Sequence, residues 1–203
     1  MKYLVTGGSG FIGSHIVQTL LERGSNVRVL DNFSSGRREN LKGLNVEIIQ
    51  GDLRDSARVA QAVRGVDVIF HEAAFVSVPE SMQKPQECFD VNVTGTFTLL
   101  ESARAAGVKR VVIASSAAVY GDSGAMPLVE GAALSQSSPY AVSKRVDEML
   151  GELYTRSFGL EVAALRYFNA CGALPGRGEA HQPESHLIPL VLRVPLGERE
   201  VRH

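Results

Sequence analysis

The stretch VTGGSGFIGSH, residues 5–15, follows a short apolar run and leads into a segment of helical periodicity. Gly7, Gly10 and Gly13 have the spacing of a phosphate-binding turn, and Gly8 with the last two also satisfies G-x-G-x-x-G. Glycine here allows a tight turn, lets the backbone approach a pyrophosphate, and lets a helix pack closely on a strand. The helix N-terminus then offers unpaired N–H groups and a partial positive charge. A glycine motif alone is also consistent with turn packing, but the strand–loop–helix context favours a dinucleotide site.

Short apolar runs alternate with helical segments along most of the chain. The candidate strands are Lys2–Thr6, Asn26–Leu30, Val46–Gln50, Val66–Phe70, Arg110–Ala114 and Glu161–Arg166. The candidate helices are Gly10–Arg23, Ser56–Arg64, Pro85–Ala106 and Tyr140–Phe158, three of which end near Gly24, Gly65 or Gly107, where a left-handed cap is needed. The strands are rich in Val, Ile and Leu without polar alternation, which is typical of parallel strands covered on both faces. The pattern predicts an α/β fold with a doubly wound parallel sheet.

Composition limits the function classes. The 203 residues suffice for one well-filled domain with room for a small appendage, and the hydrophobic and charged contents of 44% and 21% are ordinary for a globular protein. A formal net charge of -1 gives no general attraction to nucleic acid or anionic membranes. We find no signal-peptide core and no apolar run long enough for a bilayer, so we expect a cytoplasmic protein. Cys88 and Cys171 lie too far apart to suggest a disulfide framework, and we expect both to be small buried hydrophobes.

The ends of two candidate strands carry carboxylates. Asp31 follows Gly13 by 18 residues. A carboxylate there can accept hydrogen bonds from the adenosine ribose hydroxyls and would repel a 2′-phosphate, which favours NAD over NADP. Asp31 is also a common turn former, and the arginines at 37 and 38 are near enough to pair with a phosphate. Asp52 and Leu53 end the third strand and are placed to hold the adenine edge, although such a pair is also an ordinary strand terminus.

A second motif, SSPYAVSKRVDE at residues 137–148, places Tyr140 one helical turn before Lys144. A tyrosine that acts as a base near neutrality needs its pKa of about 10 lowered by about 3 units. One nearby cation typically supplies about 1 to 3 units, so a cationic nicotinamide ring would have to add to the effect of Lys144. Ser115 and Ser116 stand where the fifth strand ends, and Ser116 is expected to hydrogen-bond the reacting oxygen and help pass the proton. Together with the glycine turn, these residues favour a catalytic site.

Several segments resemble those of the extended short-chain dehydrogenases/reductases. They are VTGGSGFIGSH, LDNFSSGRREN, GDLRD, HEAA, NVTGT, SSAAVYG, YAVSK and LRYFNACGA. The chain is similar to the NAD-dependent sugar epimerase/dehydratase family, and most to its UDP-glucose 4-epimerases, in which a loop like GEAHQPESHLIPLVL closes over the nucleotide sugar. The resemblance implies a Rossmann fold and an isomerase of galactose metabolism that interconverts UDP-glucose and UDP-galactose through a 4-keto intermediate, with NAD regenerated.

The resemblance also implies roles for individual residues. The catalytic residues would be Ser116, Tyr140 and Lys144, with Tyr140 taking the proton of the sugar 4-hydroxyl. NAD would contact Gly7, Gly10, Phe11, Ile12, Gly13, Asp31, Asn32, Ser34, Ser35, Gly36, Asp52, Leu53, Ala73, Ala74, Asn92, Tyr140, Lys144 and Phe168. The nucleotide sugar would contact Ser116, Tyr140, Asn169, His186 and Leu187. A homodimer would form through the helices Pro85–Ala106 and Tyr140–Phe158.

Members of this family continue beyond the length of this chain. We therefore expect an NAD-binding domain at residues 1–168 and an incomplete substrate-binding lobe at residues 169–203. Two alternatives remain: a truncated NAD-binding module without turnover, or another nucleotide-sugar enzyme, such as a UDP-N-acetylhexosamine or UDP-uronate epimerase or decarboxylase.

Two further comparisons with the family narrow the chemistry. Sugar 4,6-dehydratases carry an Asp-Glu pair directly after the serine, where this chain has Ala117 and Ala118. The acid and base for water elimination are therefore missing. His181 and His186, with the glutamates at 179 and 184, are an alternative metal site, but their spacing matches no strong ligand pattern, and we predict no metal.

Overall fold

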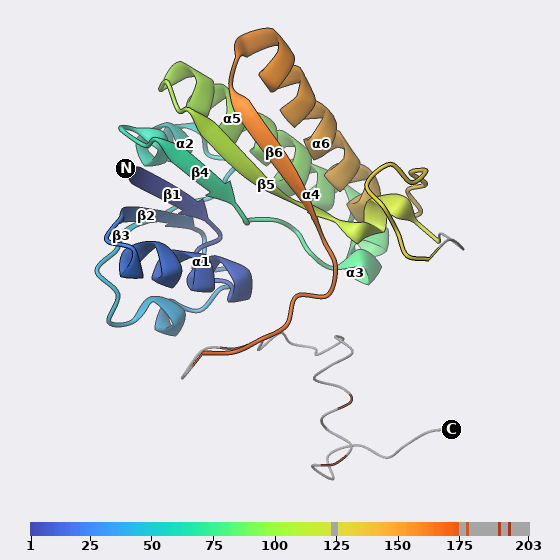
Figure 1. Ribbon diagram of the computed structural model, residues 1–203, viewed down its shortest axis with the longest axis horizontal. Coiled ribbons are helices and arrows are strands. Elements are labelled where there is room, and N and C mark those ends of the chain that lie inside the picture. The colour runs from blue at the N-terminus through green and yellow to red at the C-terminus, as the bar shows by residue number, and fades with distance from the viewer. Residues whose placement is uncertain (123–125, 175–177, 179–190, 192–194, 196–203) are drawn as a thin grey trace. The chain divides into compact units, whose positions relative to one another are not determined.

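The computed structural model describes residues 1–122, 126–174, 178, 191 and 195 (Figure 1). The chain divides into two units, Met1–Phe168 and Asn169–His203. The expected assignment of residues 1–168 to an NAD-binding domain and of residues 169–203 to a substrate-binding lobe remains a prediction. Cys171, in the second unit, is exposed, so the expectation that both cysteines are buried is wrong for this residue and right for Cys88. No helix in the described residues is long and apolar enough to cross a bilayer.

The first unit is built on a six-stranded sheet in which every neighbouring pair is parallel (Figure 1). The strands are β1 (Lys2–Thr6), β2 (Asn26–Asp31), β3 (Glu47–Gln50), β4 (Val68–His71), β5 (Arg110–Ser116) and β6 (Glu161–Tyr167), in the order β3-β2-β1-β4-β5-β6. The chain runs outward from β1 to β3 and then returns to β4 on the other side of β1. The predicted doubly wound sheet is therefore confirmed, and its switch point lies between β1 and β4, where such sheets bind ligands at their carboxyl edge.

The helices confirm most of the predicted segments. They are α1 (Phe11–Glu22), α2 (Ser56–Val63), α3 (Val78–Gln83), α4 (Pro85–Phe89), α5 (Gly95–Ala105) and α6 (Pro139–Phe158). A π-helical turn, Asp90–Thr94, divides the single helix predicted at 85–106 into α4 and α5. Short 3₁₀ helices at Arg38–Leu41 and Ala117–Tyr120 and the six-residue α3 were not predicted, because elements this short carry too few apolar positions for a periodic pattern.

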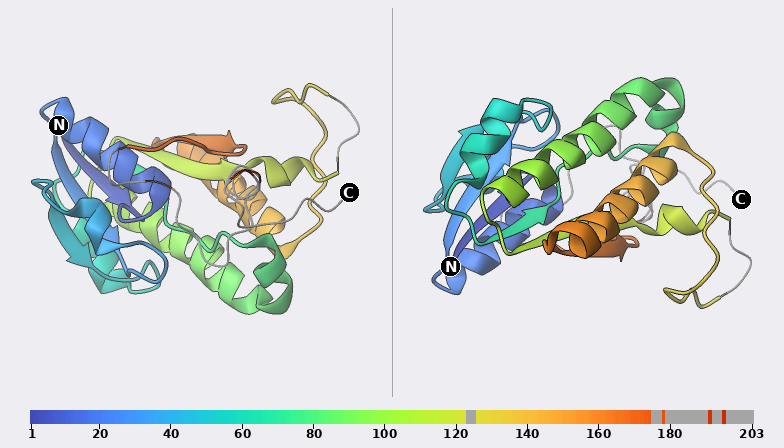
Figure 2. Two further views of the ribbon diagram at one scale, coloured as in Figure 1. Left: turned by 90° about the horizontal axis from the view of Figure 1, so that it is seen from below. Right: turned by 90° about the horizontal axis from the view of Figure 1, so that it is seen from above.

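Apolar side chains form two cores, one on each face of the sheet. Val5, Val17 and Val29 lie in the core between α1 and the strands β1 and β2. Ile69, Leu99 and other residues of the second core pack the opposite face against α2, α5 and α6. Figure 2 shows α5 and α6 running beside each other over that face.

β6 corrects one expectation. We expected all strands to be covered on both faces, but most residues of the edge strand β6 are exposed, including Leu165. Val162, Arg166 and Tyr167 are half-buried; Val162 packs against the α6 side of the sheet, and a Cβ at Gly151 would lie 2.8 Å from it. The apolar composition of β6 therefore predicted its place in a parallel sheet but did not predict that the strand is exposed.

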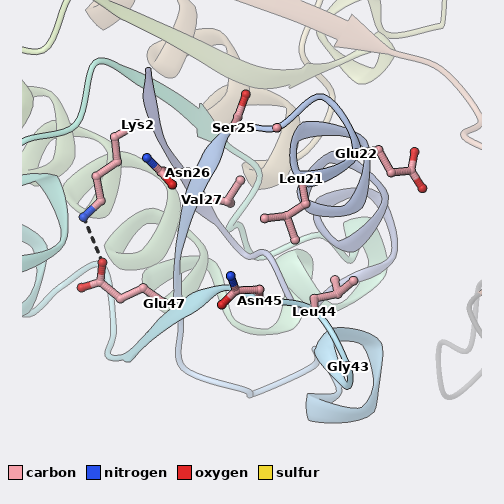
Figure 3. Close-up of a pocket in the computed structure, with 11 residues that line it drawn as sticks. Lys2, Leu21, Glu22, Ser25, Asn26, Val27, Gly43, Leu44, Asn45 and Glu47 are labelled. Atoms are coloured by element: carbon pink, nitrogen blue, oxygen red, sulfur yellow. Dashed lines mark hydrogen bonds and ion pairs between the residues drawn. The ribbon is translucent and has the colours of Figure 1, made fainter.

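One concavity lies at the amino-terminal edge of the sheet (Figure 3). Its lining includes Lys2 and Asn26, at the starts of β1 and β2, and Gly24, just after α1. An ion pair of 3.0 Å joins the Nζ atom of Lys2 to Glu47. Since the glycine turn follows the carboxyl end of β1, this concavity lies at the opposite edge from the predicted site.

Candidate functional site

The glycine turn after β1 is packed backbone against backbone. Gly7 has a φ of 65°, and its N–H donates to the carbonyl of Leu30 on β2 at 2.9 Å. A Cβ at Gly7 would lie 2.7 Å from the backbone nitrogen of Ala73, in the loop after β4. A Cβ at Gly13 would lie only 2.2 Å from the carbonyl oxygen of Gly7. The turn thus brings three elements together at a distance that no side chain permits.

The N-terminus of α1 is open toward this turn. Gly10 is the N-cap and supplies no side-chain hydrogen bond, and the first turn contains no acidic residue. The first backbone N–H groups of a helix have no acceptor within it, so those at 11–13 and the helix dipole suit an anion. The hydroxyl of Ser9 is buried and has no hydrogen-bond partner among the described residues. The amides and this hydroxyl fit a pyrophosphate.

Asp31 joins the glycine turn to the loop after β2. Its Oδ2 accepts a hydrogen bond from the Ser9 N–H at 2.9 Å, and its Oδ1 accepts one from the Phe33 N–H at 2.8 Å. Each carboxylate oxygen retains a further lone pair for a ribose hydroxyl. These two bonds fix the orientation of the carboxylate, and its role in binding the ribose remains a prediction.

Arg38, in the segment after β2, already contacts two other side chains. Its guanidinium lies 3.9 Å from the centre of the Phe33 ring and donates a hydrogen bond to Gln50. The alternative in which Arg38 pairs with a ribose phosphate would require both contacts to be exchanged. Asp52 is similarly engaged: hydrogen bonds from Arg54, supported by one from Asn32, hold the pKa of its carboxyl far below the usual range.

The predicted catalytic residues lie where β5 ends and α6 begins. Ser138 caps α6 by accepting the Ala141 N–H at 3.1 Å. Lys144 is buried, and its Nζ donates to the carbonyl of Ala114 at 2.8 Å. This bond crosses from α6 to β5 two residues before Ser116, whose hydroxyl accepts the N–H of Ala118 at 3.1 Å. Tyr140 is half-buried one helical turn before Lys144.

A network of charged side chains supports this edge of the sheet. Glu148 accepts hydrogen bonds from the Ser115 hydroxyl at 2.7 Å, from Arg145 at 2.9 Å, and from Arg166 at 2.8 and 2.9 Å. Burial raises the pKa of the Glu148 carboxyl, but the hydrogen bonds, that of Arg166 first, outweigh it and leave the pKa below its usual value. Arg166 also donates to the Tyr120 hydroxyl at 2.8 Å, so the network joins α6, β5, β6 and the segment after β5.

Two more carboxyls at this edge have raised pKa values. Burial raises the pKa of Glu72 to about 6, against the effects of a hydrogen bond from Tyr167 and of the Lys144 charge. Burial likewise raises the pKa of Asp147 to about 6, although the nearby Lys144 charge lowers it. Neither of these residues, nor Glu148, was predicted from the sequence. For Asp147 and Glu148 a signal was available, because Lys144, Asp147 and Glu148 fall at i, i+3 and i+4 on the buried face of α6.

The remaining predicted contacts differ in their placement. Asn92 is buried and its side chain bonds the backbone of Phe75 and the hydroxyl of Ser143, so it ties the loop after β4 to α6. Leu53 is buried, whereas Phe168 is exposed at the end of the first unit. Ala73 and Ala74 lie in the loop after β4, and Ser34, Ser35 and Gly36 in the loop after β2. Asn169 belongs to the second unit, and His186, Leu187 and the histidine–glutamate group considered for a metal lie outside the described residues.

Residues 3–202 match the NAD dependent epimerase/dehydratase family. The chain belongs to this family. Membership in the NAD dependent epimerase/dehydratase family agrees with the predicted fold and with NAD as the predicted cofactor.

The relatives are longer than this chain. A UDP-glucose 4-epimerase of Streptomyces lividans is 45% identical over 98% of this chain, which covers 61% of that protein. A crystal structure of UDP-glucose 4-epimerase from Brucella ovis in complex with NAD superposes with a TM-score of 0.91 at 36% identity, over 99% of this chain and 62% of that one. A structure of a UDP-N-acetylglucosamine 4-epimerase from Methanobrevibacter ruminantium M1, in complex with UDP-N-acetylmuramic acid, superposes with a TM-score of 0.89 at 37% identity. The match covers 97% of this chain and 63% of that one. The chain thus spans about three fifths of the length of these relatives.

Proposed function

We propose that this chain forms the NAD-binding and catalytic part of a UDP-glucose 4-epimerase, which interconverts UDP-glucose and UDP-galactose. The observation that carries the proposal is the bond from the Nζ of Lys144 to the Ala114 carbonyl. It fixes the start of α6 against the end of β5, beside Ser116 and at the same edge of the sheet as the glycine turn. The relatives named UDP-glucose 4-epimerase support the choice of reaction.

The residues present fit NAD as the cofactor. The open N-terminus of α1 and the unpartnered hydroxyl of Ser9 would hold the pyrophosphate, and the carboxylate of Asp31 would accept the ribose hydroxyls. When bound, NAD would supply reversible oxidation at C4 of the sugar. Tyr140 and Lys144 would contact the nicotinamide ribose, as the family resemblance implies.

The protein's part in the reaction is to move one proton. The Tyr140 hydroxyl would take the proton of the sugar 4-hydroxyl and later return it, with the Ser116 hydroxyl bonded to the same oxygen. Lys144, one helical turn after Tyr140, and a bound oxidised nicotinamide are the two cations that the family resemblance places beside the Tyr140 hydroxyl. Ala117 and Ala118 supply neither an acid nor a base, which argues against dehydration.

The substrate class depends on parts that the first unit lacks. We propose that Asn169, His186 and Leu187 contact the nucleotide sugar, by resemblance alone. An N-acetylhexosamine substrate is the second candidate, favoured by the M. ruminantium structure. A cytoplasmic location also remains a prediction.

The reaction is tested by incubating the protein with UDP-galactose and NAD and separating the products. We expect UDP-glucose without net NADH or CO₂. Net NADH or CO₂ would indicate another nucleotide-sugar enzyme, and conversion of UDP-N-acetylgalactosamine alone would indicate the second candidate. Titration calorimetry with each ligand covers the remaining case: a module that binds NAD but no UDP-sugar contradicts the proposed reaction.

Asp31→Asn should relax the preference for NAD over NADP by about tenfold or more, equivalent to about 1.4 kcal/mol. The substitution keeps the size of the side chain but removes the charge that repels a 2′-phosphate. The ratio of the two dissociation constants, measured by calorimetry, is the readout. Asp67→Asn, at the amino-terminal edge of the sheet, is the matched control and should leave the ratio unchanged. An unchanged ratio in both variants would show that Asp31 does not select the cofactor.

We propose that the predicted homodimer forms through exposed apolar side chains on α5 and α6. Phe97 on α5 is 48% exposed and Leu153 on α6 is 50% exposed. Apolar side chains on adjacent exposed helices suit a protein interface. Light scattering should therefore give twice the chain mass of 21.8 kDa for the wild type and the single mass for Phe97→Glu/Leu153→Glu. Ile48→Glu, on the exposed β3, should remain dimeric; a dilute monomeric wild type would refute the prediction.

A further inference from the structure

Asp147 is a buried carboxylate whose pairing is incomplete. Its side chain is fully buried on α6, and its Oδ2 lies 3.6 Å from the Nζ of Lys144. Neither oxygen accepts a well-aligned hydrogen bond from the described residues, although the nearby Thr96 hydroxyl lowers the pKa of the group. A buried charge is costly unless it is paired and hydrogen-bonded. Asp147 therefore depends on Lys144 and on the orientation of the Thr96 hydroxyl.

Thr96 is the end of a buried chain that begins beside the glycine turn. Thr6, the residue before Gly7, places its Oγ1 2.7 Å from the Nδ1 of His71. The Nε2 of His71 lies 2.9 Å from the Oγ1 of Thr96. The hydroxyl of Thr6 also accepts the N–H of Ala73 at 3.2 Å. Thr6, His71 and Thr96 are all buried, so no bulk water competes for these bonds.

His71 can carry only one ring proton in this chain. Burial, and secondarily the Lys144 charge, lowers the pKa of His71 to about 3. A neutral imidazole donates from one nitrogen and accepts at the other. His71 therefore has two states, with its proton on Nε2 toward Thr96 or on Nδ1 toward Thr6.

The charge on Asp147 distinguishes these states. An ionised Asp147 can only accept, so it favours a Thr96 hydroxyl that donates to it, a His71 Nε2–H that donates to Thr96, and a Thr6 hydroxyl that donates to Nδ1. A protonated Asp147 donates to Thr96 instead. The Thr96 hydroxyl then turns to Nε2, and the ring proton moves to Nδ1 and donates to Thr6. The chain as a whole gains one proton, on Asp147.

We propose that Asp147 is a positioning residue for Lys144, and that Thr96 couples its charge to the ring proton of His71, which lies on Nε2 when Asp147 is ionised and on Nδ1 when it is neutral. The other titratable groups near Asp147 and Lys144 are Glu148 on α6, Glu72 after β4, and Cys88 on α4. Glu148 is bound by two arginines, and burial raises the pKa of the Cys88 thiol, so neither changes charge between pH 5 and 8. Glu72 titrates near pH 6 as well and must be separated from Asp147 by mutation.

The consequence for turnover rests on the proposed function. The Lys144 ammonium is held between the Ala114 carbonyl, 2.8 Å from its Nζ, and the Asp147 carboxylate, 3.6 Å from it, so loss of the carboxylate charge removes one of these two contacts. Asp147→Asn should therefore lower kcat about tenfold or more and leave KM nearly unchanged, because Asp147 acts through Lys144 rather than on substrate.

The decisive measurement needs neither cofactor nor substrate. Long-range ¹H–¹⁵N spectra of the whole chain distinguish protonated from unprotonated ring nitrogens of His71. In the wild type we expect the Nε2–H form at pH 8 and a shift toward the Nδ1–H form at pH 5, with a midpoint near 6. Asp147→Asn should abolish this pH dependence, and Glu72→Gln should preserve it.

A matched pair at position 96 tests the same coupling without touching a charge. Thr96→Ser keeps the hydroxyl and should keep the transition, while Thr96→Val removes the hydroxyl and should lose it. If Asp147→Asn does not fold, these two variants test the coupling between Asp147 and the ring proton of His71 in its place. A single His71 form from pH 5 to 8 in the wild type, a doubly protonated ring, or an unchanged midpoint in Asp147→Asn or Thr96→Val would overturn the proposal. Since none of these outcomes involves turnover, they are separate from a failure of the proposed reaction.

Discussion

Tyr140→Phe is expected to reduce the interconversion of UDP-galactose and UDP-glucose by about 10²- to 10⁴-fold, the range for loss of a general acid or base. This corresponds to about 3 to 5 kcal/mol of activation free energy. The phenol oxygen is the only atom removed. The hydrogen bonds seen at this residue involve its backbone, since the N–H of Tyr140 donates to Ser81 and its carbonyl accepts from Ser143. The start of α6 should therefore keep its position.

Three measurements separate loss of the proton carrier from other defects. Initial rates with UDP-galactose give kcat and KM, and calorimetry should show NAD affinity within a few-fold of the wild type. Tyr3→Phe makes the same chemical change on β1 at the amino-terminal edge of the sheet and should retain full activity. Lys144→Met should also lose activity, because it removes the ammonium whose Nζ holds the start of α6 to the Ala114 carbonyl. Wild-type rates in Tyr140→Phe would require another proton carrier, and Glu72 would be the first residue to test.

The glycine turn and the strand pattern were sufficient to predict the doubly wound sheet. Both are local signals: apolar runs mark buried strands, and three glycines mark a backbone contact that no side chain permits. The boundaries were less well predicted where a turn uses apolar residues. Val66, for example, belongs to the turn after α2, where its N–H bonds the Val63 carbonyl, rather than to β4. The exposure of β6 was missed because it depends on what covers a strand rather than on the strand's own sequence.

Within the candidate site, the residues predicted from the sequence are those that belong to a recognisable motif. Tyr140 and Lys144 share a helix, so their spacing alone places them together. Asp147 shares α6 with Lys144, but Thr96 on α5 and His71 on β4 come from distant parts of the chain, and no sequence spacing predicts that they lie near Asp147. The same holds for Asn92. The resemblance assigned it to the cofactor, whereas its side-chain amide is hydrogen-bonded to the backbone of Phe75 and to the hydroxyl of Ser143. Contacts between distant segments, such as those of Asn92 and Thr96, are recognisable only once the fold has assembled them.

Gly13→Ala is expected to weaken NAD binding by about 100-fold or more, or roughly 2.7 kcal/mol, and to lower thermal stability. Two effects oppose each other. Alanine favours a helix over glycine by about 1 kcal/mol, which would stabilise α1. The new Cβ, however, would lie 2.2 Å from the carbonyl oxygen of Gly7 and 2.8 Å from the Cα of Gly8. Both atoms are backbone and cannot rotate away, so α1 must move off the turn, and overpacking of this kind costs about 1 to 3 kcal/mol.

The displacement of α1 explains why binding should suffer more than folding. The helix can move away from the turn and remain packed on the sheet through Val17 and Leu20, but its N-terminal amides then no longer lie against the glycine turn. The melting temperature of Gly13→Ala should fall by roughly 3 to 10 °C relative to the wild type. Gly131→Ala is the matched control: its Cβ meets no atom within 4 Å and its φ is not left-handed, so stability and NAD affinity should stay near wild type. Unchanged NAD affinity in Gly13→Ala would mean that the cofactor does not lie on the N-terminus of α1.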